Sequence, residues 1–212
     1  MLEMYKSCVK RVIDFLVALI ATPFVLVIIL IMAPIIYICD PGPVFYNATR
    51  LGKKGKPFTM FKFRSMYVGS PDLRNEDGST YNSDEDPRVT KVGRIMRKTS
   101  LDEVPQILNV LKGDMSFVGP RPTLSTKPFQ EIPEKNRKRY EVRPGITGYS
   151  QAYYRNSITQ DEKFEQDNYY VAHMTFLNDI KIIFKTIESV LKHDNIYSEN
   201  EQKDIYKKAE NK

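Results

Sequence analysis

The sequence predicts an α+β protein that is predominantly helical and carries a membrane segment near its N-terminal end. Residues 15–39 form an uncharged apolar run, and a run of this length is typical of a helix inserted in a bilayer. Apolar residues recur at helical spacing over 104–111 and 176–191, which indicates amphipathic helices. The segment 58–64 alternates loosely between apolar and polar residues, and we expect a short strand there.

Length and composition limit the possible domains and partners. The 212 residues suit one domain with appendages, and we expect a membrane element over 1–40, a main domain over 41–192 and a charged tail over 193–212. The two cysteines, Cys8 and Cys39, flank or sit in the apolar run, so we expect neither a disulfide framework nor a cysteine metal site. The net charge of +6 suits an anionic substrate, a membrane surface or nucleic acid. Zinc-finger spacing and an RNP signature are absent, so we expect no nucleic-acid partner.

The charges around the apolar run bear on whether it crosses the membrane. Pro23 falls inside the run and should bend a helix there, leaving halves of about 15 Å, half the hydrocarbon thickness. The flanks are basic on both sides, with Lys6, Lys10 and Arg11 before the run and Arg50, Lys53, Lys54 and Lys56 after it. The positive-inside tendency draws both ends to the cytoplasmic side, which favours a re-entrant hairpin over a kinked span. Asp14 is expected at the interface or paired with Arg11.

The segment 100–122 carries an adjacent carboxylate pair, Asp102 and Glu103. Apolar residues follow the pair at helical spacing, and Gly113 is typical of a helix stop. Because proline fits poorly inside a helix, Pro105 indicates that the helix begins close to Asp102. Both acids would then lie where free backbone N–H groups and the helix dipole favour anions.

Two interpretations of this pair compete. Residues 100–103, Ser-Leu-Asp-Glu, fit the S-x-x-E capping box, which stabilises a helix and needs no function. Taken alone, these four residues favour the cap. The cations Arg94, Arg97 and Lys98 lie just upstream, however, and acids, cations and a helix N-terminus together suit a metal-bound phosphate ester.

Other basic residues are ambiguous on sequence grounds. Lys62 and Arg64 would share one face of the strand, as a solvated face or as a phosphate contact. The basic segment 128–140 is helix-prone, and it either faces solvent or meets anionic lipid. Arg143 and Arg155 are further candidates for anion contact.

Three more segments complete the expectations. Residues 52–57, rich in glycine and lysine, are expected to form a hairpin loop. The polar stretch 69–90 is expected to be a surface loop; its acids Asp84, Glu85 and Asp86 lack calcium-loop spacing, so a solvated acidic loop is favoured over a metal site. The helix expected over 176–191 either packs on the core or lies in the membrane interface.

Taken in order, several short motifs resemble those of the small bacterial sugar transferases, the monotopic phosphoglycosyl transferases. The resemblance covers nearly the whole chain. It is carried by residues 10–14 (KRVID), 42–46 (GPVFY), 62–66 (KFRSM), 86–90 (DPRVT), 100–106 (SLDEVPQ), 109–116 (NVLKGDMS), 118–122 (VGPRP), 143–148 (RPGITG), 162–164 (EKF) and 179–181 (DIK). Each motif is weak by itself, but the ordered set is specific and favours chemistry at Asp102 and Glu103 over the capping box.

The resemblance implies a phosphoglycosyl transferase at the bacterial inner membrane. Such an enzyme moves a phosphosugar from a UDP-sugar to polyprenyl phosphate, releases UMP, and passes through a covalent aspartyl-phosphosugar. The family's shallow re-entrant helix implies a monotopic protein with a catalytic domain on the cytoplasmic face, interfacial amphipathic helices and contact with membrane lipids. The resemblance also allows an oligomer.

The resemblance assigns roles residue by residue. Asp102 matches the nucleophile and would bind Mg²⁺, and Glu103 matches its dyad partner. Arg97 matches the family's phosphate-contact arginine. The turn Pro120-Arg121-Pro122 matches a segment associated with the nucleotide. Together with the basic residues above, the expected phosphate or substrate contacts are Lys62, Arg97, Pro120, Arg121, Pro122, Arg143 and Arg155.

The chain departs from the family pattern at a few positions. Gln160 and Asp161 stand where an aromatic residue usually precedes the motif at 162–164, and Tyr149 occupies a variable place. These positions bear on sugar choice or local packing, so the sequence predicts no particular sugar. A scaffold protein that had lost the chemistry would show a broken dyad or a missing arginine, and the sequence shows neither.

Overall fold

The computed structural model describes residues 5–73, 81, 83, 85–124, 128–155 and 157–192. It has the mixed, mostly helical composition that the sequence predicts. Short helical turns begin the described chain at Tyr5–Val9 and recur between the larger elements. The helices are α2 (Lys10–Cys39), α3 (Lys91–Lys98), α4 (Gln106–Lys112), α5 (Tyr149–Tyr153), α6 (Gln160–Ala172) and α7 (Phe176–Lys192). The strands are β1 (Ala48–Leu51), β2 (Pro57–Met60), β3 (Ser116–Val118), β4 (Thr123–Leu124) and β5 (Gly145–Thr147).

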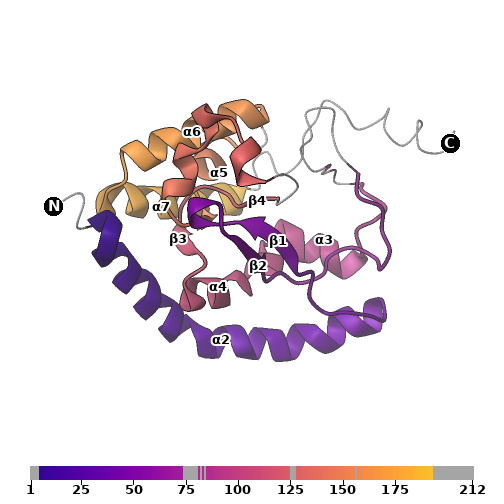
Figure 1. Ribbon diagram of the computed structural model, residues 1–212. Helices are drawn as coiled ribbons and strands as arrows, with labels where there is room; N and C mark the ends of the chain where they lie inside the picture. Colours follow the sequence, from indigo (N-terminus) through magenta and orange to yellow (C-terminus); the bar gives the residue numbers. More distant parts are fainter. Residues whose placement is uncertain are drawn as a thin grey trace, which may run out of the picture.

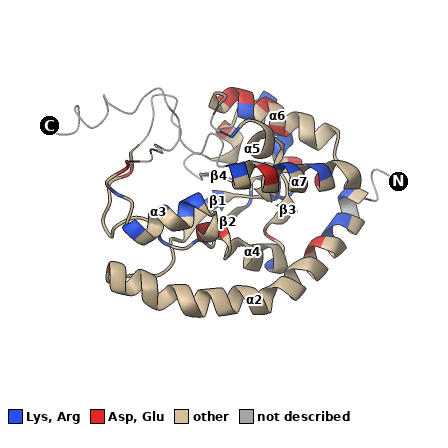
Figure 2. Ribbon diagram, turned by 180° about the vertical axis from the view of Figure 1, so that it is seen from behind, with Lys and Arg blue, Asp and Glu red and all other residues tan. Residues whose placement is uncertain are grey.

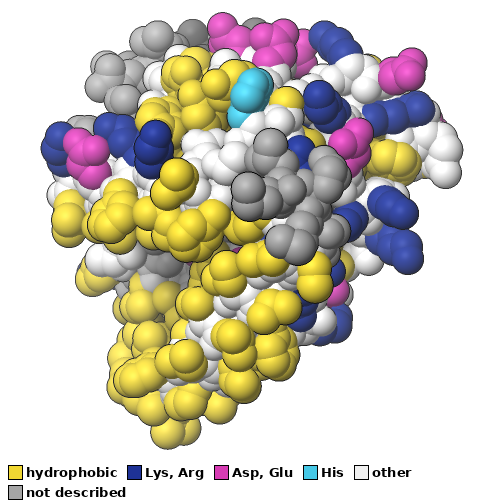
Figure 3. Space-filling view, turned by 90° about the vertical axis from the view of Figure 1, so that its left-hand side faces the viewer, with side chains coloured by type: hydrophobic (Ala, Val, Ile, Leu, Met, Phe, Trp, Pro, Cys, Tyr) yellow, Lys and Arg dark blue, Asp and Glu magenta, His cyan; other side chains and the backbone are white. Residues whose placement is uncertain are grey.

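α2 is one continuous helix of 30 residues that bends along its length and runs beneath the rest of the molecule (Figure 1). It contains Pro23 and Pro34, and prolines are a recognised cause of helix bending. Within the described residues, it is the one helix long and apolar enough to cross a membrane. After its first turns the helix carries no charged side chain, as its tan ribbon in Figure 2 shows. The resulting apolar wedge projects from the body of the molecule in Figure 3.

Both ends of α2 are bound to the rest of the molecule through charged groups. Near its start, Lys10 forms a buried ion pair with Asp179 of α7. At its end, Asp40 accepts hydrogen bonds from the guanidinium of Arg64, through both its carboxylate and its main-chain carbonyl. The two contacts fix both ends of the apolar helix to one body.

The next turn of α2 is fixed by polar contacts that the sequence did not predict. The carboxylate of Asp14 accepts a hydrogen bond from the Phe117 N–H at 3.2 Å and is buried against β3. Arg11 donates to the carbonyls of Val110 and Leu111 at the end of α4. The expected pair of Asp14 with Arg11 is therefore wrong, because each side chain binds a backbone group of a neighbouring element, while the position of Asp14 at the membrane interface stays a prediction.

Two small sheets build the centre of the molecule. β1 lies between β2 and β4 and pairs antiparallel with both, while β3 and β5 form a parallel pair. The predicted hairpin loop is confirmed, since Leu51 pairs with Pro57 across it. The predicted strand over 58–64 is shorter, because regular pairing of β2 ends at Met60 and only an isolated bridge follows, between Phe63 and Phe45.

Three apolar clusters form the core and place α2 against the segment that carries Asp102 and Glu103. Ala18 of α2 packs with residues of β2, α4 and the start of β3. Ile36, near the other end of α2, packs with Phe63 and Met96. A third cluster joins β3, α5, α6 and α7 around Tyr170 and Ile182. The segment that carries the carboxylate pair therefore lies between α2 and the sheets.

Two predicted helical segments have different outcomes. The amphipathic helix over 176–191 is confirmed as α7; it buries Ile182 in the core and exposes a row of large apolar residues. The helix-prone segment 128–140 instead forms three short 3₁₀ turns, at Phe129–Glu131, Glu134–Asn136 and Lys138–Glu141. Prolines at the start of the first two turns lack the N–H groups that a continuous helix would use. The predicted tail 193–212 lies outside the described residues.

Candidate active site

Asp102 and Glu103 lie in a 3₁₀ turn, Leu101–Glu103, that precedes α4. The prediction that the helix begins near Asp102 is therefore wrong, since α4 begins at Gln106. Pro105 has no N–H to donate to the carbonyl of Leu101, which instead accepts from Val104 at 3.2 Å and closes a tighter turn. The predicted helix stop is confirmed, because Gly113 has the left-handed conformation at the end of α4 (φ 101°).

The capping box that the sequence allowed is not formed. Ser100 has left-handed backbone angles (φ 57°) and its side chain makes no capping hydrogen bond. Its partner in that motif, Glu103, is turned instead toward two cations. The carboxylates are thus not explained by stabilisation of a helix start.

Lys62 and Arg121 bring positive charge to the carboxylate pair. The Lys62 Nζ lies 2.8 Å from Asp102 Oδ2 and 3.3 Å from Glu103 Oε1. The Arg121 Nη2 lies 3.6 Å from Glu103 Oε1, and its side chain is 57% exposed. By contrast, Asp102 is buried, at 3% exposure. The four residues form a compact group of two acids and two cations with Arg121 on its open side, which we call the dyad cluster.

The opposite charges of the dyad cluster favour the ionised forms of Lys62 and Glu103. Burial acts to lower the pKa of Lys62, but the adjacent carboxylates of Asp102 and Glu103 outweigh it and raise the pKa. Burial acts to raise the pKa of Glu103, and the charges of Lys62 and Arg121 reverse this and lower it. Lys62 therefore remains protonated and Glu103 ionised at neutral pH.

The segment after β2 holds Lys62 in place through its backbone. The Phe63 N–H donates to the carbonyl of Asp102 at 3.0 Å, so that the segment runs beside the turn that carries the acids. The Phe61 N–H donates to the buried side chain of Asn109 in α4 at 2.8 Å. Lys62 and Arg64 were predicted to share one strand face, but Lys62 reaches the dyad cluster while Arg64 reaches Asp40 at the end of α2.

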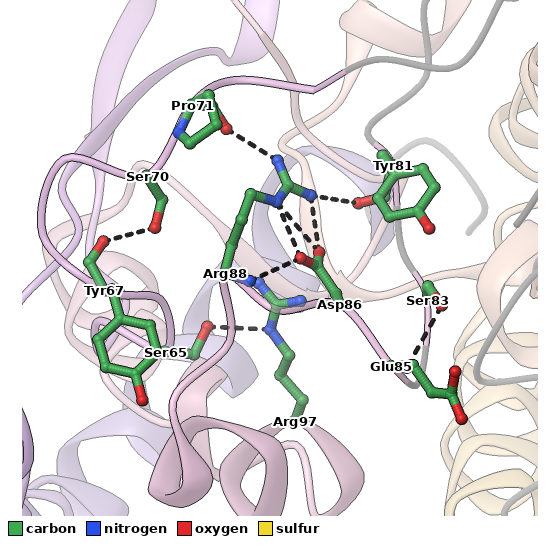
Figure 4. Close-up of polar contacts among 10 residues, drawn as sticks. All are labelled: Ser65, Tyr67, Ser70, Pro71, Tyr81, Ser83, Glu85, Asp86, Arg88 and Arg97. Atoms are coloured by element: carbon green, nitrogen blue, oxygen red, sulfur yellow. Dashed lines mark hydrogen bonds and ion pairs between the residues drawn. The ribbon is translucent and has the colours of Figure 1, made fainter. Parts of the chain in front are cut away.

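The other predicted arginines lie outside the dyad cluster. Arg97, in the last turn of α3, donates its Nε–H to Ser65 Oγ at 2.9 Å (Figure 4). Arg143 donates to the carbonyl of Gly113, and burial, followed by the charge of Arg11, lowers its pKa. Arg155 follows α5 with left-handed backbone angles (φ 47°). Their roles as phosphate contacts remain predictions.

The Pro120-Arg121-Pro122 turn is supported by a buried ion pair that sequence reasoning missed. Arg139 donates to the Arg121 carbonyl at 2.6 Å and pairs with Asp167 Oδ2 at 2.7 Å. Its guanidinium also lies 4.3 Å from the ring centre of Phe164. Arg139 is 3% exposed, which overturns the prediction of a solvated basic face at this position. Because basic residues are clustered over 128–140, the sequence did not distinguish the buried Arg139 from the others.

A second missed pair lies in the loop that the sequence predicted to be solvated. Asp86 is fully buried and accepts three hydrogen bonds from the Arg88 guanidinium, at 2.7, 2.9 and 3.2 Å (Figure 4). The same guanidinium donates to the carbonyls of Pro71 and Tyr81. The expectation of a solvated acidic loop is wrong for Asp86, while Glu85 is exposed as expected and Asp84 lies outside the described residues.

The dyad cluster supplies only part of the ligand set that a magnesium ion needs. Among the described residues, no group of three or more His, Cys, Asp or Glu side chains could hold a metal. Mg²⁺ commonly takes one or two carboxylates and completes its coordination with substrate phosphates and water. Asp102 and Glu103 supply that number of carboxylates, so the residues fit an ion that arrives with a phosphate-bearing substrate.

Comparisons with known proteins agree on the class of protein. A family profile described as "Bacterial sugar transferase" matches residues 5–193. The chain is 42% identical over 194 residues to "Uncharacterized sugar transferase EpsL" of Bacillus subtilis (strain 168), covering 90% of this chain and 91% of that protein. It is 41% identical over 189 residues to "UDP-N-acetylgalactosamine-undecaprenyl-phosphate N-acetylgalactosaminephosphotransferase" of Aeromonas hydrophila, covering 86% and 44%.

A third relative carries a different sugar in its name. The chain is 38% identical over 185 residues to "UDP-glucose:undecaprenyl-phosphate glucose-1-phosphate transferase" of Escherichia coli (strain K12), covering 84% of this chain and 39% of that protein. The chain therefore spans nearly all of one relative and less than half of the two whose names state a reaction.

Proposed function

The chain belongs to the bacterial sugar transferase family, and from this premise we propose that it transfers a phosphosugar from a UDP-sugar to undecaprenyl phosphate and releases UMP. Two relatives carry this type of reaction in their names, with N-acetylgalactosamine and with glucose as the sugar. Because those names differ in the sugar, the proposal leaves the sugar open. The observation that carries it is the buried carboxylate of Asp102 beside Glu103, with Lys62 and Arg121 in contact.

We propose that Asp102 acts as a covalent nucleophile. Its carboxylate attacks the phosphorus that bears the sugar, the bond to the bridging oxygen of the diphosphate breaks, and UMP leaves with the bonding electron pair. An oxygen of the lipid phosphate then attacks the same phosphorus and frees the carboxylate. Two displacements replace one difficult transfer, which is the advantage of covalent catalysis. Lys62, whose Nζ lies 2.8 Å from Asp102 Oδ2, holds the carboxylate in place for the first step.

The remaining members of the dyad cluster stabilise negative charge. Arg121 is exposed and lies next to Glu103, so its planar guanidinium can contact phosphate oxygens of an entering diphosphate. Glu103, kept ionised by two cations, can orient or deprotonate a reactant. Mg²⁺, held by Asp102 together with substrate phosphates, would supply further charge neutralisation.

We propose that the protein is monotopic and faces the cytoplasm of the bacterial inner membrane. This placement is supported by the contacts at both ends of α2, Lys10 with Asp179 and Asp40 with Arg64. A helix that spans a bilayer has its ends on opposite sides, about 30 Å apart, and one folded body cannot hold both ends without lying in the hydrocarbon. A bent helix inserted from one side satisfies both contacts and places the dyad cluster near the lipid headgroups.

α7 supports the same orientation. Its outer face exposes large apolar side chains, namely Phe176, Leu177, Phe184, Ile187 and Leu191. Lysines accompany them at Lys181, Lys185 and Lys192. An amphipathic helix of this kind suits the boundary between acyl chains and anionic headgroups. We therefore propose that α7 lies in the membrane interface.

The proposed chemistry is tested by UMP release and by isolation of the covalent intermediate. Purified protein with a panel of UDP-sugars and Mg²⁺ should release UMP and retain a phosphosugar on Asp102, detectable by intact-protein mass spectrometry. Asp102→Asn should abolish both signals. Glu165→Gln is a control for loss of a carboxylate charge, because Glu165 is an exposed acid of α6. Undiminished turnover in Asp102→Asn would refute the nucleophile.

A further inference from the structure

Helix α3, which carries Arg97, is docked closely against the backbone of Ser65. The carbonyl oxygen of Ser65 accepts a hydrogen bond from the Thr90 N–H at 3.1 Å, just before α3 begins. A Cβ atom built on Gly93 would lie 1.9 Å from the same oxygen. The absence of a side chain at Gly93 therefore lets the first turn of α3 lie directly on Ser65.

The side chain of Ser65 makes a second contact with α3. Its Oγ accepts the Nε–H of Arg97 at 2.9 Å, and Ser65 is 5% exposed (Figure 4). A hydrogen bond to a charged donor in a buried place is stronger than one between neutral groups. It restricts the long arginine side chain at the atom next to its guanidinium carbon, and so limits the directions in which the guanidinium can point.

The same short segment reaches the dyad cluster. Lys62 contacts both carboxylates, and the Phe63 N–H donates to the Asp102 carbonyl at 3.0 Å. Ser65 follows two residues after Phe63. One extended segment therefore fixes the carboxylates at one end and Arg97 at the other, and the position of Arg97 relative to Asp102 depends on Ser65.

The far side of this segment is supported by the buried Asp86–Arg88 pair. The Tyr67 N–H donates to the Arg88 carbonyl at 2.8 Å, and Met66 forms a β-bridge with Val89. Figure 4 shows Arg97 and Ser65 directly beside this pair. The buried Asp86–Arg88 pair thus supports the segment on the side of Ser65 that faces away from the carboxylates.

We propose that Ser65 is a positioning residue that orients Arg97 toward the phosphates of the nucleotide-sugar. The role rests on the proposed function, in which Arg97 contacts phosphate. Ser65 does not touch the substrate; its hydroxyl supplies the acceptor that selects one orientation of the guanidinium. Without that acceptor the arginine keeps its charge but loses a buried contact that directs its guanidinium, and a displacement of about 1 Å can cost about a hundredfold in rate.

The test compares Ser65→Thr with Ser65→Val, two side chains of equal shape that differ in the hydroxyl. Ser65→Val should lower kcat/KM for the UDP-sugar by about tenfold to a hundredfold. Ser65→Thr keeps the acceptor and should restore kcat/KM to within about threefold of the wild type, by the same principle. Equal kcat/KM in the two variants would overturn the proposal, because a purely steric role would affect both alike.

A double-mutant cycle identifies the group through which Ser65 acts. Arg97→Lys keeps a cation but lacks the Nε–H donor. If Ser65 acts through Arg97, Ser65→Val should cause no further loss in the Arg97→Lys background. The same loss in both backgrounds would show that Ser65 acts by another route and would overturn the proposal.

An NMR measurement separates failure of this inference from failure of the proposed function. The Arg97 Nε–H signal, assigned by its loss in Arg97→Lys, should shift in Ser65→Val and stay near its wild-type position in Ser65→Thr. An unchanged signal in Ser65→Val would overturn the positioning role while UMP release by the wild type still stands. Wild-type protein that releases UMP from none of the UDP-sugars would overturn the proposed function and this role with it.

Discussion

Lys62 contacts two adjacent carboxylates with one ammonium group. Its Nζ lies between Asp102 Oδ2 and Glu103 Oε1, at 2.8 and 3.3 Å. Two neighbouring acids in a partly buried place repel each other, and each disfavours ionisation of the other. The lysine offsets that repulsion by placing positive charge against both carboxylates before any metal or substrate arrives.

We predict that Lys62→Met lowers UMP release about a hundredfold and moves the acid limb of its pH profile to higher pH. The charge of Lys62 is a main cause of the lowered pKa of Glu103. Removing that charge raises the pKa, so the Glu103 carboxylate ionises at higher pH. The measurement is kcat/KM against pH. Lys62→Arg keeps the charge and should keep the acid limb in place. An unshifted limb in Lys62→Met would contradict this account.

Arg139 and Asp167 are a residue pair whose effect is on stability. Their side chains are 3% and 2% exposed, and they lie 2.7 Å apart. We predict that Arg139→Met costs about 3–5 kcal/mol of unfolding free energy, because it leaves a buried carboxylate unpaired. Denaturant unfolding of the detergent-solubilised protein measures this.

The matched control for that prediction removes both charges. Arg139→Met combined with Asp167→Leu should recover most of the stability, since a buried ion pair is often replaceable by apolar residues of similar volume. Recovery of stability without recovery of activity would show that Arg139 also fixes the Pro120–Pro122 turn through the Arg121 carbonyl. A double variant as unstable as the single one would contradict the explanation by an unpaired charge.

At the scale of elements, the position of α3 depends on one glycine. A Cβ at Gly93 would meet the carbonyl oxygen of Ser65 at 1.9 Å, and backbone cannot move aside as a flexible side chain can. We predict that Gly93→Ala destabilises the fold by about 1–3 kcal/mol or more through overpacking, with a matching loss of activity. Ile95→Ala, at a position of α3 that is 65% exposed, should change stability by less than about 0.5 kcal/mol. Thermal unfolding of both variants tests the contrast, and equal midpoints would refute it.

Elements with a strong local signal could be predicted from the sequence. The apolar run gives α2, the helical period gives α7, and Gly113 ends α4. The start of α4 could not, because Pro105 is compatible with a helix beginning on either side of it. Residues 128–140 have helix-forming composition, but prolines and the burial of Arg139 divide them into short turns.

The candidate site was predictable as a set of residues but not as an arrangement. The ordered motifs pointed to Asp102, Glu103, Lys62 and Arg121, which the fold brings together. The motif at 86–90 includes Asp86 and Arg88 but does not indicate that they pair, and the Arg139–Asp167 pair has no local signal, since these charges look like those of solvated segments. Burial by distant parts of the chain decides which charges pair, and no local pattern records it.

At the scale of the whole molecule, the two ends of α2 decide how the protein meets the membrane. Lys10 and Asp14 attach one end to α7 and β3, and Asp40 attaches the other end to Arg64. Between them the helix exposes many large apolar side chains, including Ile20, Phe24, Leu30 and Ile38. Exposed apolar side chains of this kind suit a lipid environment, while the charged contacts hold both ends to the folded body. A re-entrant helix that enters and leaves the same leaflet, as proposed above, satisfies both conditions.

We predict that both flanks of α2 lie on the same, cytoplasmic side. The exposed native Cys8 reports on one flank in a Cys39→Ser background, and Lys56→Cys reports on the other in a protein without Cys8 and Cys39. In intact cells neither cysteine should react with a membrane-impermeant maleimide added from outside, and both should react once the membrane is permeabilised. A cysteine in an external loop of a known membrane protein is the positive control. Labelling of one reporter in intact cells would require α2 to cross the bilayer, and the contacts of Lys10 and of Asp40 could then not exist in the same molecule.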